Sequence, residues 1–211
     1  MNLLYLHGFA SSPGSTKAQF FRTRLAELGI VLEIPDLAPD FARMTVTSEL
    51  EIVARHLERG PAVVFGSSLG GYLAALAAVR WPERVAGLVL FAPAFGFAER
   101  WEARLGPEEM AQWRRAGTRP TLHYGTGREE PLSIALLDDA KQYPSEPAVG
   151  CPCLILAGRR DDAVPLEVVE HFAAAGPRRT LVRYDAGHEL TEVLEPMWER
   201  TRDFLHRLAA A

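Results

Sequence analysis

The 211 residues of the chain, with 24% charged residues and a net charge of -4, are typical of one globular domain. No basic cluster indicates nucleic-acid binding, and the apolar stretches are shorter than the ~20 residues that span a bilayer. The first residues carry no basic segment or cleavage site of a signal peptide, so a cytoplasmic protein is expected. Cys151 and Cys153 are too few for a zinc site and are expected to be buried free thiols.

Short apolar runs alternate with helical patterns along the chain. The runs are apolar at nearly every position, as strands buried on both faces of a parallel sheet are. In chain order, the expected strands are residues 2–6, 30–34, 62–66, 85–91, 153–157 and 180–184. The expected helices are residues 15–28, 45–59, 69–80, 165–175 and 192–208. This alternation predicts one α/β domain over residues 1–211, with a doubly wound, mainly parallel six-stranded sheet.

One connection is much longer than a simple crossover. The expected strands 85–91 and 153–157 are separated by about 60 residues, far more than the usual two to six residues of a loop. The segment "GPEEMAQWRRAG" within it has a helical pattern, and aromatic residues are frequent. We therefore expect residues 94–150 to form a lid or cap inserted over the carboxyl edge of the sheet.

A serine lies between two glycines where the central strand meets the next helix. Gly66-Ser67-Ser68-Leu69-Gly70 fits the pattern G-x-S-x-G, in which a tight turn between strand and helix exposes the serine hydroxyl. The same pattern arises by chance in glycine-rich turns, but here a buried strand precedes it and an alanine-rich helix follows it. We therefore predict that Ser68 is a nucleophile and that Ser67 has no chemical role.

A serine nucleophile needs a base and an acid that orients the base. His188 in "DAGHEL" follows the last strand, which places it on the same edge of a parallel sheet as Ser68, and it is the preferred base. His123, in the predicted lid, is the alternative. Asp161 and Asp162 both follow the fifth strand on this edge, so either can orient the histidine while the other serves the turn.

The oxyanion of an acyl-transfer intermediate needs two N–H donors. Leu69 directly follows Ser68 and begins a helix, so its N–H is one expected donor. The loop after the first strand is expected to supply the other, from Phe9, because Gly8 allows a close backbone approach. His7 is then expected to be structural. This chemistry requires no metal and no organic cofactor.

Aromatic residues of the insertion are candidates for a substrate pocket. Phe97 and Trp101 share a face if they are helical, and Phe95 precedes them. Because the insertion leaves the sheet beside Ser68, we expect Phe95, Phe97 and Trp101 to wall a pocket for an acyl or aryl group, with Phe9 on the other side. These rings could also simply pack the lid on the sheet.

Four blocks of the sequence resemble the α/β-hydrolase superfamily: "LYLHGFASSPGSTKA", "FGSSLGGYLA", "GRRDDAVP" and "GH" at 187–188. The first two are most similar to small bacterial YqiA-type esterases, and parts of the insertion resemble the palmitoyl-protein thioesterase-like branch. The resemblance implies Ser68, His188 and Asp161 as catalytic triad, since the acid stands four residues before the proline. It also implies a trimmed sheet, because no residues are left for the usual N-terminal hairpin, with residues 30–34 at one edge.

The expected function is that of a serine esterase. The substrate would be a small-molecule carboxylic ester of short to medium acyl chain, cleaved through an acyl-enzyme intermediate. An acyl-thioesterase acting on acyl-CoA or S-acyl substrates uses the same groups and is the alternative. A non-catalytic ligand-binding protein on this fold is a third hypothesis. Neither a nucleic-acid partner nor a membrane span is expected.

Overall fold

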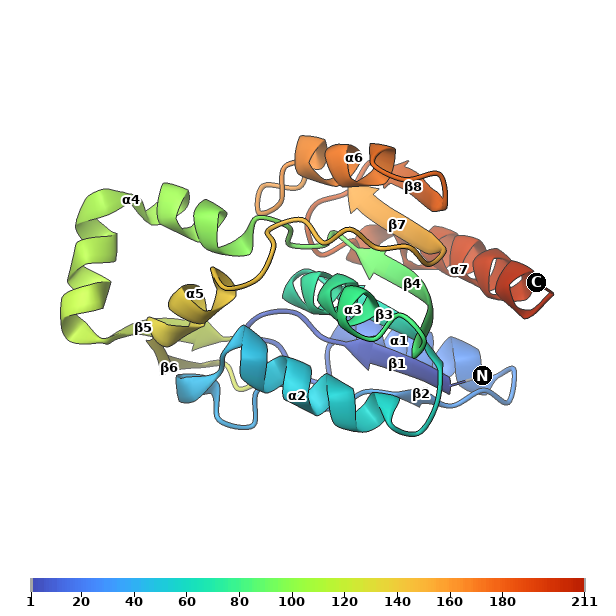
Figure 1. Cartoon of the computed structure of the whole chain (residues 1–211), viewed down its shortest axis with the longest axis horizontal. Helices are drawn as coiled ribbons and strands as arrows, with labels where there is room; N and C mark the ends of the chain where they lie inside the picture. The colour runs from blue at the N-terminus through green and yellow to red at the C-terminus, as the bar shows by residue number, and fades with distance from the viewer. Residues whose placement is uncertain (1, 211) are drawn as a thin grey trace.

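The computed structural model describes residues 2–210, and a parallel sheet forms its centre (Figure 1). The strand order is β2-β1-β3-β4-β7-β8, and every neighbouring pair in this sheet is parallel. The strands are β1 (Asn2–Leu6), β2 (Leu32–Glu33), β3 (Ala62–Ser67), β4 (Val85–Phe91), β7 (Cys153–Gly158) and β8 (Arg179–Tyr184). The predicted six-stranded doubly wound sheet is confirmed. The edge strand within residues 30–34 is present, but only Leu32 and Glu33 pair.

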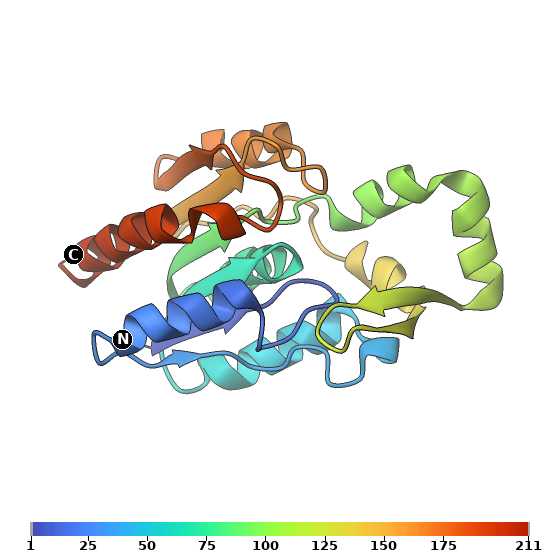
Figure 2. The same ribbon diagram turned by 180° about the vertical axis from the view of Figure 1, so that it is seen from behind.

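Helices cover both faces of the sheet (Figures 1 and 2). One face carries α1 (Thr16–Ala26) and α7 (Leu194–Ala209), and the other carries α2 (Val46–Leu57), α3 (Leu69–Arg80) and α6 (Leu166–Ala174). Two short 3₁₀ helices, η1 (Phe41–Arg43) and η2 (Thr191–Val193), precede α2 and α7. None of the helices described in residues 2–210 is long and apolar enough to cross a membrane.

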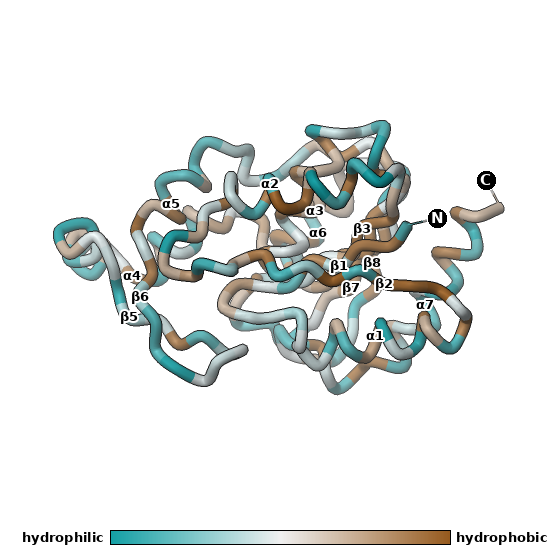
Figure 3. The backbone as a smooth tube through the Cα atoms, turned by 90° about the horizontal axis from the view of Figure 1, so that it is seen from below, coloured by the Kyte–Doolittle hydropathy of each residue, from teal (hydrophilic) through white to brown (hydrophobic). Residues whose placement is uncertain are grey.

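The position of the core follows from the hydropathy of the strands and of α3. The strands at the centre are the most apolar segments, while the outer helices alternate between apolar and polar residues (Figure 3). Helix α3 is buried at ten of its 12 residues, because it contacts the sheet on one side and α2 on another. Its small alanine side chains permit this close packing. The junction of β3 and α3 is therefore a rigid point in the middle of the molecule.

The long connection between β4 and β7 projects from the carboxyl edge of the sheet, as the arrowheads in Figure 1 show. It contains α4 (Phe97–Ala116), β5 (Thr118–His123), β6 (Arg128–Ser133) and α5 (Ala135–Ala140). Helix α4 is kinked at Gly106, whose φ of 74° is left-handed, directly before Pro107. The antiparallel hairpin β5–β6 was not predicted. Its strands are short and mostly polar, so they lack the apolar pattern that marks the other strands.

Hydrogen bonds close the neck of this insertion and tie it to α3 and to the loop after β1. At its neck, the N–H of Gly96 donates to the carbonyl of Ser145 at 2.9 Å, and the hydroxyl of Tyr72 in α3 donates to the carbonyl of Pro144 at 3.0 Å. At its far end, the N–H of Tyr124 donates to the carbonyl of Ala10 at 2.8 Å. The turn of the hairpin therefore lies against the loop that follows β1.

The two cysteines are both free thiols, but they differ in burial. Cys153 begins β7 and is fully buried, and burial raises the pKa of its thiol well above the ordinary value. Cys151 is partly exposed, which corrects the expectation of two buried thiols, because it lies before the strand where the chain returns from the insertion.

Candidate active site

Ser68 lies at a sharp turn between the central strand and its helix. Strand β3 ends at Ser67, and α3 begins at Leu69. Ser68 has a φ of 53° and a ψ of -117°, a backbone conformation that residues other than glycine rarely adopt. Its N–H donates to the carbonyl of Phe91 in β4 at 2.9 Å. Such strain persists only when the surrounding structure enforces it, and it is concentrated at functional sites.

The two glycines of the motif are required by the closeness of the backbone. A Cβ on Gly66 would lie 2.3 Å from the carbonyl oxygen of Gly70. A Cβ on Gly70 would lie 2.2 Å from the carbonyl oxygen of Leu6, at the end of β1. No side chain fits at either position. The glycines thus let β1, β3 and α3 meet at one point and hold Ser68 at the carboxyl edge of the sheet.

Three side chains from separate loops form one hydrogen-bonded series at this edge. Nε2 of His188 lies 3.0 Å from Oγ of Ser68, and Nδ1 of His188 lies 2.8 Å and 3.0 Å from the two carboxylate oxygens of Asp161. A carboxylate on Nδ1 holds the proton there, so Nε2 is left free to accept the serine proton. The Asp161 side chain is 2% exposed and that of His188 is 18% exposed. The series is therefore closed to solvent at Asp161 and partly open at His188.

The carboxylate of Asp161 is fixed by its own loop. Its Oδ1 accepts hydrogen bonds from the N–H groups of Ala163 at 2.9 Å and Val164 at 2.7 Å. Asp162 is exposed and makes no hydrogen bond among residues 2–210. Hence, of the two aspartates that the sequence left open before the resemblance, Asp161 is the one that contacts His188.

His123, the alternative base, lies elsewhere in the insertion. Its Nδ1 accepts the N–H of Thr126 at 3.2 Å within the hairpin turn, and its ring packs edge-on against Phe41 at 4.8 Å. Both contacts are structural. The structure places no hydrogen bond between this ring and Ser68 among the described residues.

The loop after β1 lies against the Ser68 turn. A Cβ on Gly8 would be 3.3 Å from the carbonyl oxygen of Ser67 and 3.4 Å from Cβ of Ser68. Within residues 2–210, neither the N–H of Phe9 nor that of Leu69 donates a hydrogen bond. Leu69 is the first residue of α3, where N–H groups have no partner in the helix and the dipole favours negative charge. Both expected oxyanion donors are therefore available.

His7 holds this loop in place. Its ring is buried, with Nδ1 3.0 Å from the carbonyl of Gly8, while Nε2 accepts the N–H of Leu37 at 3.1 Å. A nitrogen that accepts carries no proton, so the ring is neutral. Burial, the largest effect, lowers the pKa of His7 and favours this neutral form. The expectation of a structural role for His7 agrees with these contacts.

Two of the three predicted pocket aromatics contact the loop after β1. The ring centre of Trp101 lies 5.3 Å from that of Phe9 in an edge-on arrangement, and Phe97 lies 6.3 Å from Phe9 and 6.0 Å from Trp101. Phe95 instead stacks on Phe172 of α6 at 4.2 Å. We call Phe9, Phe97 and Trp101 the aromatic wall. It runs from the insertion to the residue that follows Gly8.

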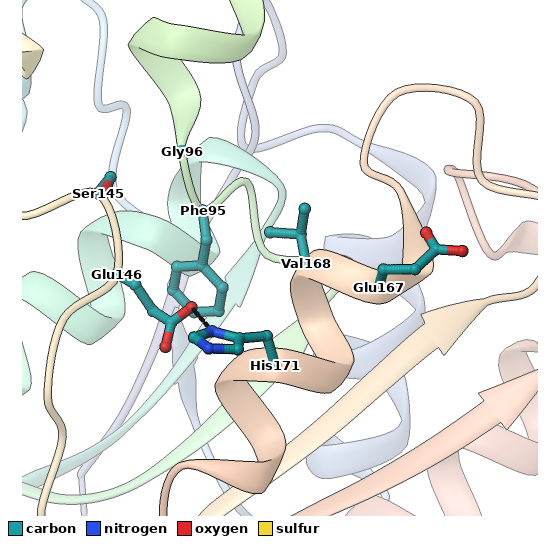
Figure 4. Close-up of a pocket in the computed structure, with 7 residues that line it drawn as sticks. All are labelled: Phe95, Gly96, Ser145, Glu146, Glu167, Val168 and His171. Carbon is teal, nitrogen blue, oxygen red and sulfur yellow. Dashed lines mark hydrogen bonds and ion pairs between the residues drawn. The ribbon is translucent and has the colours of Figure 1, made fainter.

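Phe95 belongs to a different part of the surface, shown in Figure 4. An open cavity of about 380 Å³ lies between the neck of the insertion and α6. Figure 4 shows His171 and Glu146 joined across it, and their side chains are 2.8 Å apart. The lining residues are Phe95, Gly96, Ser145, Glu146, Glu167, Val168 and His171. None of the three residues of the hydrogen-bonded series lines this cavity.

Two further charged residues contact the segments around the site, a role that the sequence reasoning did not reveal. Nζ of Lys17 in α1 donates to Oγ of Ser67 at 3.1 Å. The guanidinium of Arg100 in α4 donates to the carbonyls of Phe95 and Ala163. A signal for Lys17 existed, because it falls on the same helical face as Phe21, but lysine at such a position normally extends to solvent.

Comparison with known proteins identifies relatives of the chain. The model of the uncharacterised protein family UPF0227 matches residues 2–205. The pimeloyl-[acyl-carrier protein] methyl ester esterase of Chromobacterium violaceum is 25% identical over 242 aligned positions, which cover 99% of this chain and 92% of that protein. These findings confirm the predicted resemblance to small esterases of the α/β-hydrolase superfamily.

Solved structures show the same fold. Alpha/beta hydrolase domain-containing protein 10 from mouse has a TM-score of 0.83 at 22% identity, covering 98% of this chain and 90% of that one. Est1E from Butyrivibrio proteoclasticus has a TM-score of 0.80 at 22% identity, covering 99% of this chain and 88% of that one. The chain therefore has the α/β-hydrolase fold.

Proposed function

The chain belongs to the uncharacterised protein family UPF0227, and we propose that it is a serine hydrolase that cleaves carboxylic esters. The observation that carries the proposal is the hydrogen-bonded series from Ser68 through His188 to Asp161. Its three members come from the loops after β3, β7 and β8, on the edge of the sheet where this fold binds ligands. Neither the strained backbone of Ser68 nor its contact with a histidine is needed for a stable fold.

In the proposed reaction, Oγ of Ser68 attacks the acyl carbonyl carbon while Nε2 of His188 takes the hydroxyl proton. The carbonyl π electrons move to oxygen and form the tetrahedral oxyanion. When the carbon–oxygen bond to the alcohol breaks, the same nitrogen protonates the leaving alkoxide, and the acyl group stays on Ser68 as an ester. Water then attacks this ester with His188 as base, and release of the acid restores the serine. Asp161 stabilises the imidazolium that forms in both steps.

The oxyanion would be held by the N–H groups of Phe9 and Leu69. Three features support this assignment: the closeness of Gly8 to Cβ of Ser68, the absence of other acceptors for either N–H within residues 2–210, and the start of α3 at Leu69. Fixed backbone donors stabilise developing negative charge without reorganising, which is usually the largest single contribution in acyl transfer.

The aromatic wall suggests where the acyl group binds. Phe9 carries one proposed oxyanion donor on its backbone and touches Phe97 and Trp101 with its ring. An acyl chain whose carbonyl lies at the donors would therefore extend along these rings, and residues 94–150 would act as a lid. The wall is short, which favours short to medium chains. The name of the relative, a methyl ester esterase, supports an oxygen ester over a thioester.

A fluorophosphonate probe and a substrate panel test the proposal. We expect the probe to label wild-type protein at Ser68, and the protein to hydrolyse p-nitrophenyl esters. Ser68→Ala should abolish labelling and lower kcat by about 10⁶, the cost of removing the nucleophile in triad enzymes. Faster turnover of matched acyl thioesters would establish the thioesterase instead. A well-folded protein with no labelling and no turnover of any ester or thioester would be a binding protein, and the proposal would fail.

A further inference from the structure

A lysine is buried directly behind the proposed nucleophile. Lys17 lies on the inward face of α1 with Ala18, Phe21 and Leu25, and it is 5% exposed. Lysine is almost never buried to this degree unless it is paired, because its ammonium group loses its hydration. The chain has one other lysine, Lys141, which lies at the surface of the insertion. The position of Lys17 therefore needs an explanation.

The amine of Lys17 contacts the segment that carries Ser68. Nζ donates to Oγ of Ser67 at 3.1 Å. Nζ also lies 5.7 Å from the ring centre of Phe91. Phe91 supplies the carbonyl that accepts the N–H of Ser68. The amine thus touches the residue before Ser68 and the residue that holds the backbone of Ser68 from the next strand.

The charges around Lys17 favour its protonated form. Asp161, Glu189 and Glu192 on the loops after β7 and β8 raise the pKa of the amine, although burial is the larger effect and lowers that pKa to about 8. On the other elements, Tyr5 stays neutral because burial raises the pKa of its phenol, and Phe91 is uncharged. At neutral pH the buried group is therefore mostly an ammonium ion.

Burial of the Lys17 ammonium group lowers the stability of the folded chain. A lysine whose pKa falls on folding destabilises the protein, fully below its folded-state pKa of about 8 and less and less as pH rises toward the ordinary value of 10.5. An apolar side chain of similar length would fill the same space without the cost of desolvation. Charged groups kept in such unfavourable surroundings are concentrated at functional sites. The Ser68 turn is also strained, and its backbone must be held in place by its neighbours.

We propose that Lys17 is a positioning residue, whose ammonium group holds Ser67 and thereby the strained backbone of Ser68. The inference rests on the proposed function, since it assumes that Ser68 is the nucleophile. The hydrogen bond from a charged donor is stronger than one from a neutral amine, so the support is greatest when Lys17 is protonated. Ser67, which has no chemical role in the reaction, becomes the connecting residue.

Lys17→Met tests the proposal, with Lys141→Met as the matched control. We expect Lys17→Met to lower kcat on p-nitrophenyl butyrate by up to about 10², the loss that misplacement of a reacting group by about 1 Å can cause. Its KM should change little, because the aromatic wall is intact. Its Tm should equal or exceed that of wild type, because a buried charge is removed. Lys141→Met should leave kcat unchanged.

Two further measurements exclude a merely structural role. Ser67→Ala removes one hydroxyl from the same contact, and the double variant should lose no more kcat than Lys17→Met alone, because the lysine acts through the serine. The kcat of wild type should fall as pH rises through about 8, where the ammonium loses its proton. This decrease should be absent in Lys17→Met.

The outcomes separate this inference from the proposed function. Wild type that neither reacts with fluorophosphonate nor hydrolyses esters would refute the proposed function, whatever Lys17 does. Active wild type with an unchanged kcat and pH profile in both Lys17→Met and Ser67→Ala would refute the inference alone. A lower Tm in Lys17→Met, with kcat retained by the folded protein, would make Lys17 structural. Labelling of Ser67 in Ser68→Ala would identify Lys17 and Ser67 as base and nucleophile, which also overturns the inference.

Discussion

Asp161 and Asp162 are adjacent in the chain, but their surroundings differ. The side chain of Asp161 is 2% exposed and accepts hydrogen bonds from two backbone N–H groups and from His188, whereas Asp162 is exposed. All of these partners of the Asp161 carboxylate are hydrogen-bond donors, which an ionised, acceptor-only carboxylate requires. An amide at the same position would bring its own N–H₂ against one of those donors. The surroundings of Asp161 therefore suit a carboxylate and no isostere.

From this difference we predict unequal effects of two matched substitutions. Asp161→Asn should lower kcat by on the order of 10⁴, as when a triad acid becomes an amide and the histidine takes the wrong tautomer. Asp162→Asn should stay close to wild type. Kinetics on p-nitrophenyl butyrate, with circular dichroism to verify folding, measure both. A larger loss in Asp162→Asn would mean that the wrong aspartate has been assigned.

Helix α4 is joined to the loop of Asp161 by Arg100. Its guanidinium donates to the carbonyl of Phe95 at 2.8 Å and to the carbonyl of Ala163, whose N–H in turn donates to Asp161. The proposed lid thus supports the loop that holds Asp161, the proposed triad acid. We predict that Arg100→Met lowers kcat on the order of tenfold, because a small displacement of that carboxylate reaches His188.

The exposed Arg115 at the end of α4 offers the matched control for this prediction. Arg115→Met changes the charge of the same helix by the same amount but touches neither loop. Measuring kcat for both variants at one pH gives the comparison. Equal kcat values for the two variants would show that the link through Ala163 carries no catalytic effect.

Helix α2 carries a buried carboxyl at its contact with the insertion. Glu49 is 1% exposed, its Oε2 has no hydrogen-bond partner within residues 2–210, and Asp139 of α5 lies near it. Burial, followed by the charge of Asp139, raises the pKa of Glu49 well above its ordinary value of 4.5. The folded state therefore binds this proton more tightly than the unfolded state. The contribution of protonated Glu49 to stability is fully present below pH 4.5 and is lost as pH rises above that value.

Glu49→Gln replaces this carboxyl by a neutral group of the same shape. We predict that the Tm difference between Glu49→Gln and wild type becomes more positive as pH is raised from 5 to 8, because only wild type must keep or ionise a buried acid. Glu51→Gln, an exposed substitution on the same helix, should show no such trend. Thermal unfolding at four pH values measures both differences. A constant difference would mean that Glu49 is paired or hydrated.

The central sheet and the proposed triad could be predicted from sequence because each rests on a short-range rule. Apolar runs mark buried parallel strands, and the loops after such strands share one edge, which brings Ser68, Asp161 and His188 together despite their separation in the chain. Gly66 and Gly70 follow from the crowding that any such turn produces. These features need no knowledge of how distant surfaces pack.

The remaining features depend on packing between distant segments. Phe95 and Phe97 are two residues apart, yet one packs against Phe172 and the other against Phe9, and nothing local in the sequence distinguishes them. The hairpin β5–β6 is polar because it lies at the surface, so it lacks an apolar pattern. Lys17 breaks the usual rule for its residue type, since it is buried. Such exceptions to local rules are expected where function competes with stability.

The relation of the insertion to the sheet leads to a prediction about substrate length. Trp101 stands where α4 meets the loop after β1, in contact with Phe9 and Phe97 and with Trp113 behind it at 5.8 Å. If the acyl chain lies along this wall, each buried methylene stabilises the transition state by up to ~0.8 kcal/mol until the wall ends. The kcat/KM of wild type on p-nitrophenyl esters from two to sixteen carbons should therefore rise, reach a maximum and fall.

Trp101→Ala should flatten this rise and move its maximum, because it removes the ring that the middle of the chain would contact. Tyr124→Ala is the matched control, since Tyr124 is an aromatic residue of the same insertion, is 75% exposed and lies outside the aromatic wall. It should keep the wild-type profile. Comparing the kcat/KM values of one variant on esters of different length cancels any general loss of activity. Only the dependence on chain length is then measured. A profile that is the same in wild type and Trp101→Ala would show that the wall only packs the insertion against the sheet, and that the acyl group binds elsewhere on the carboxyl edge.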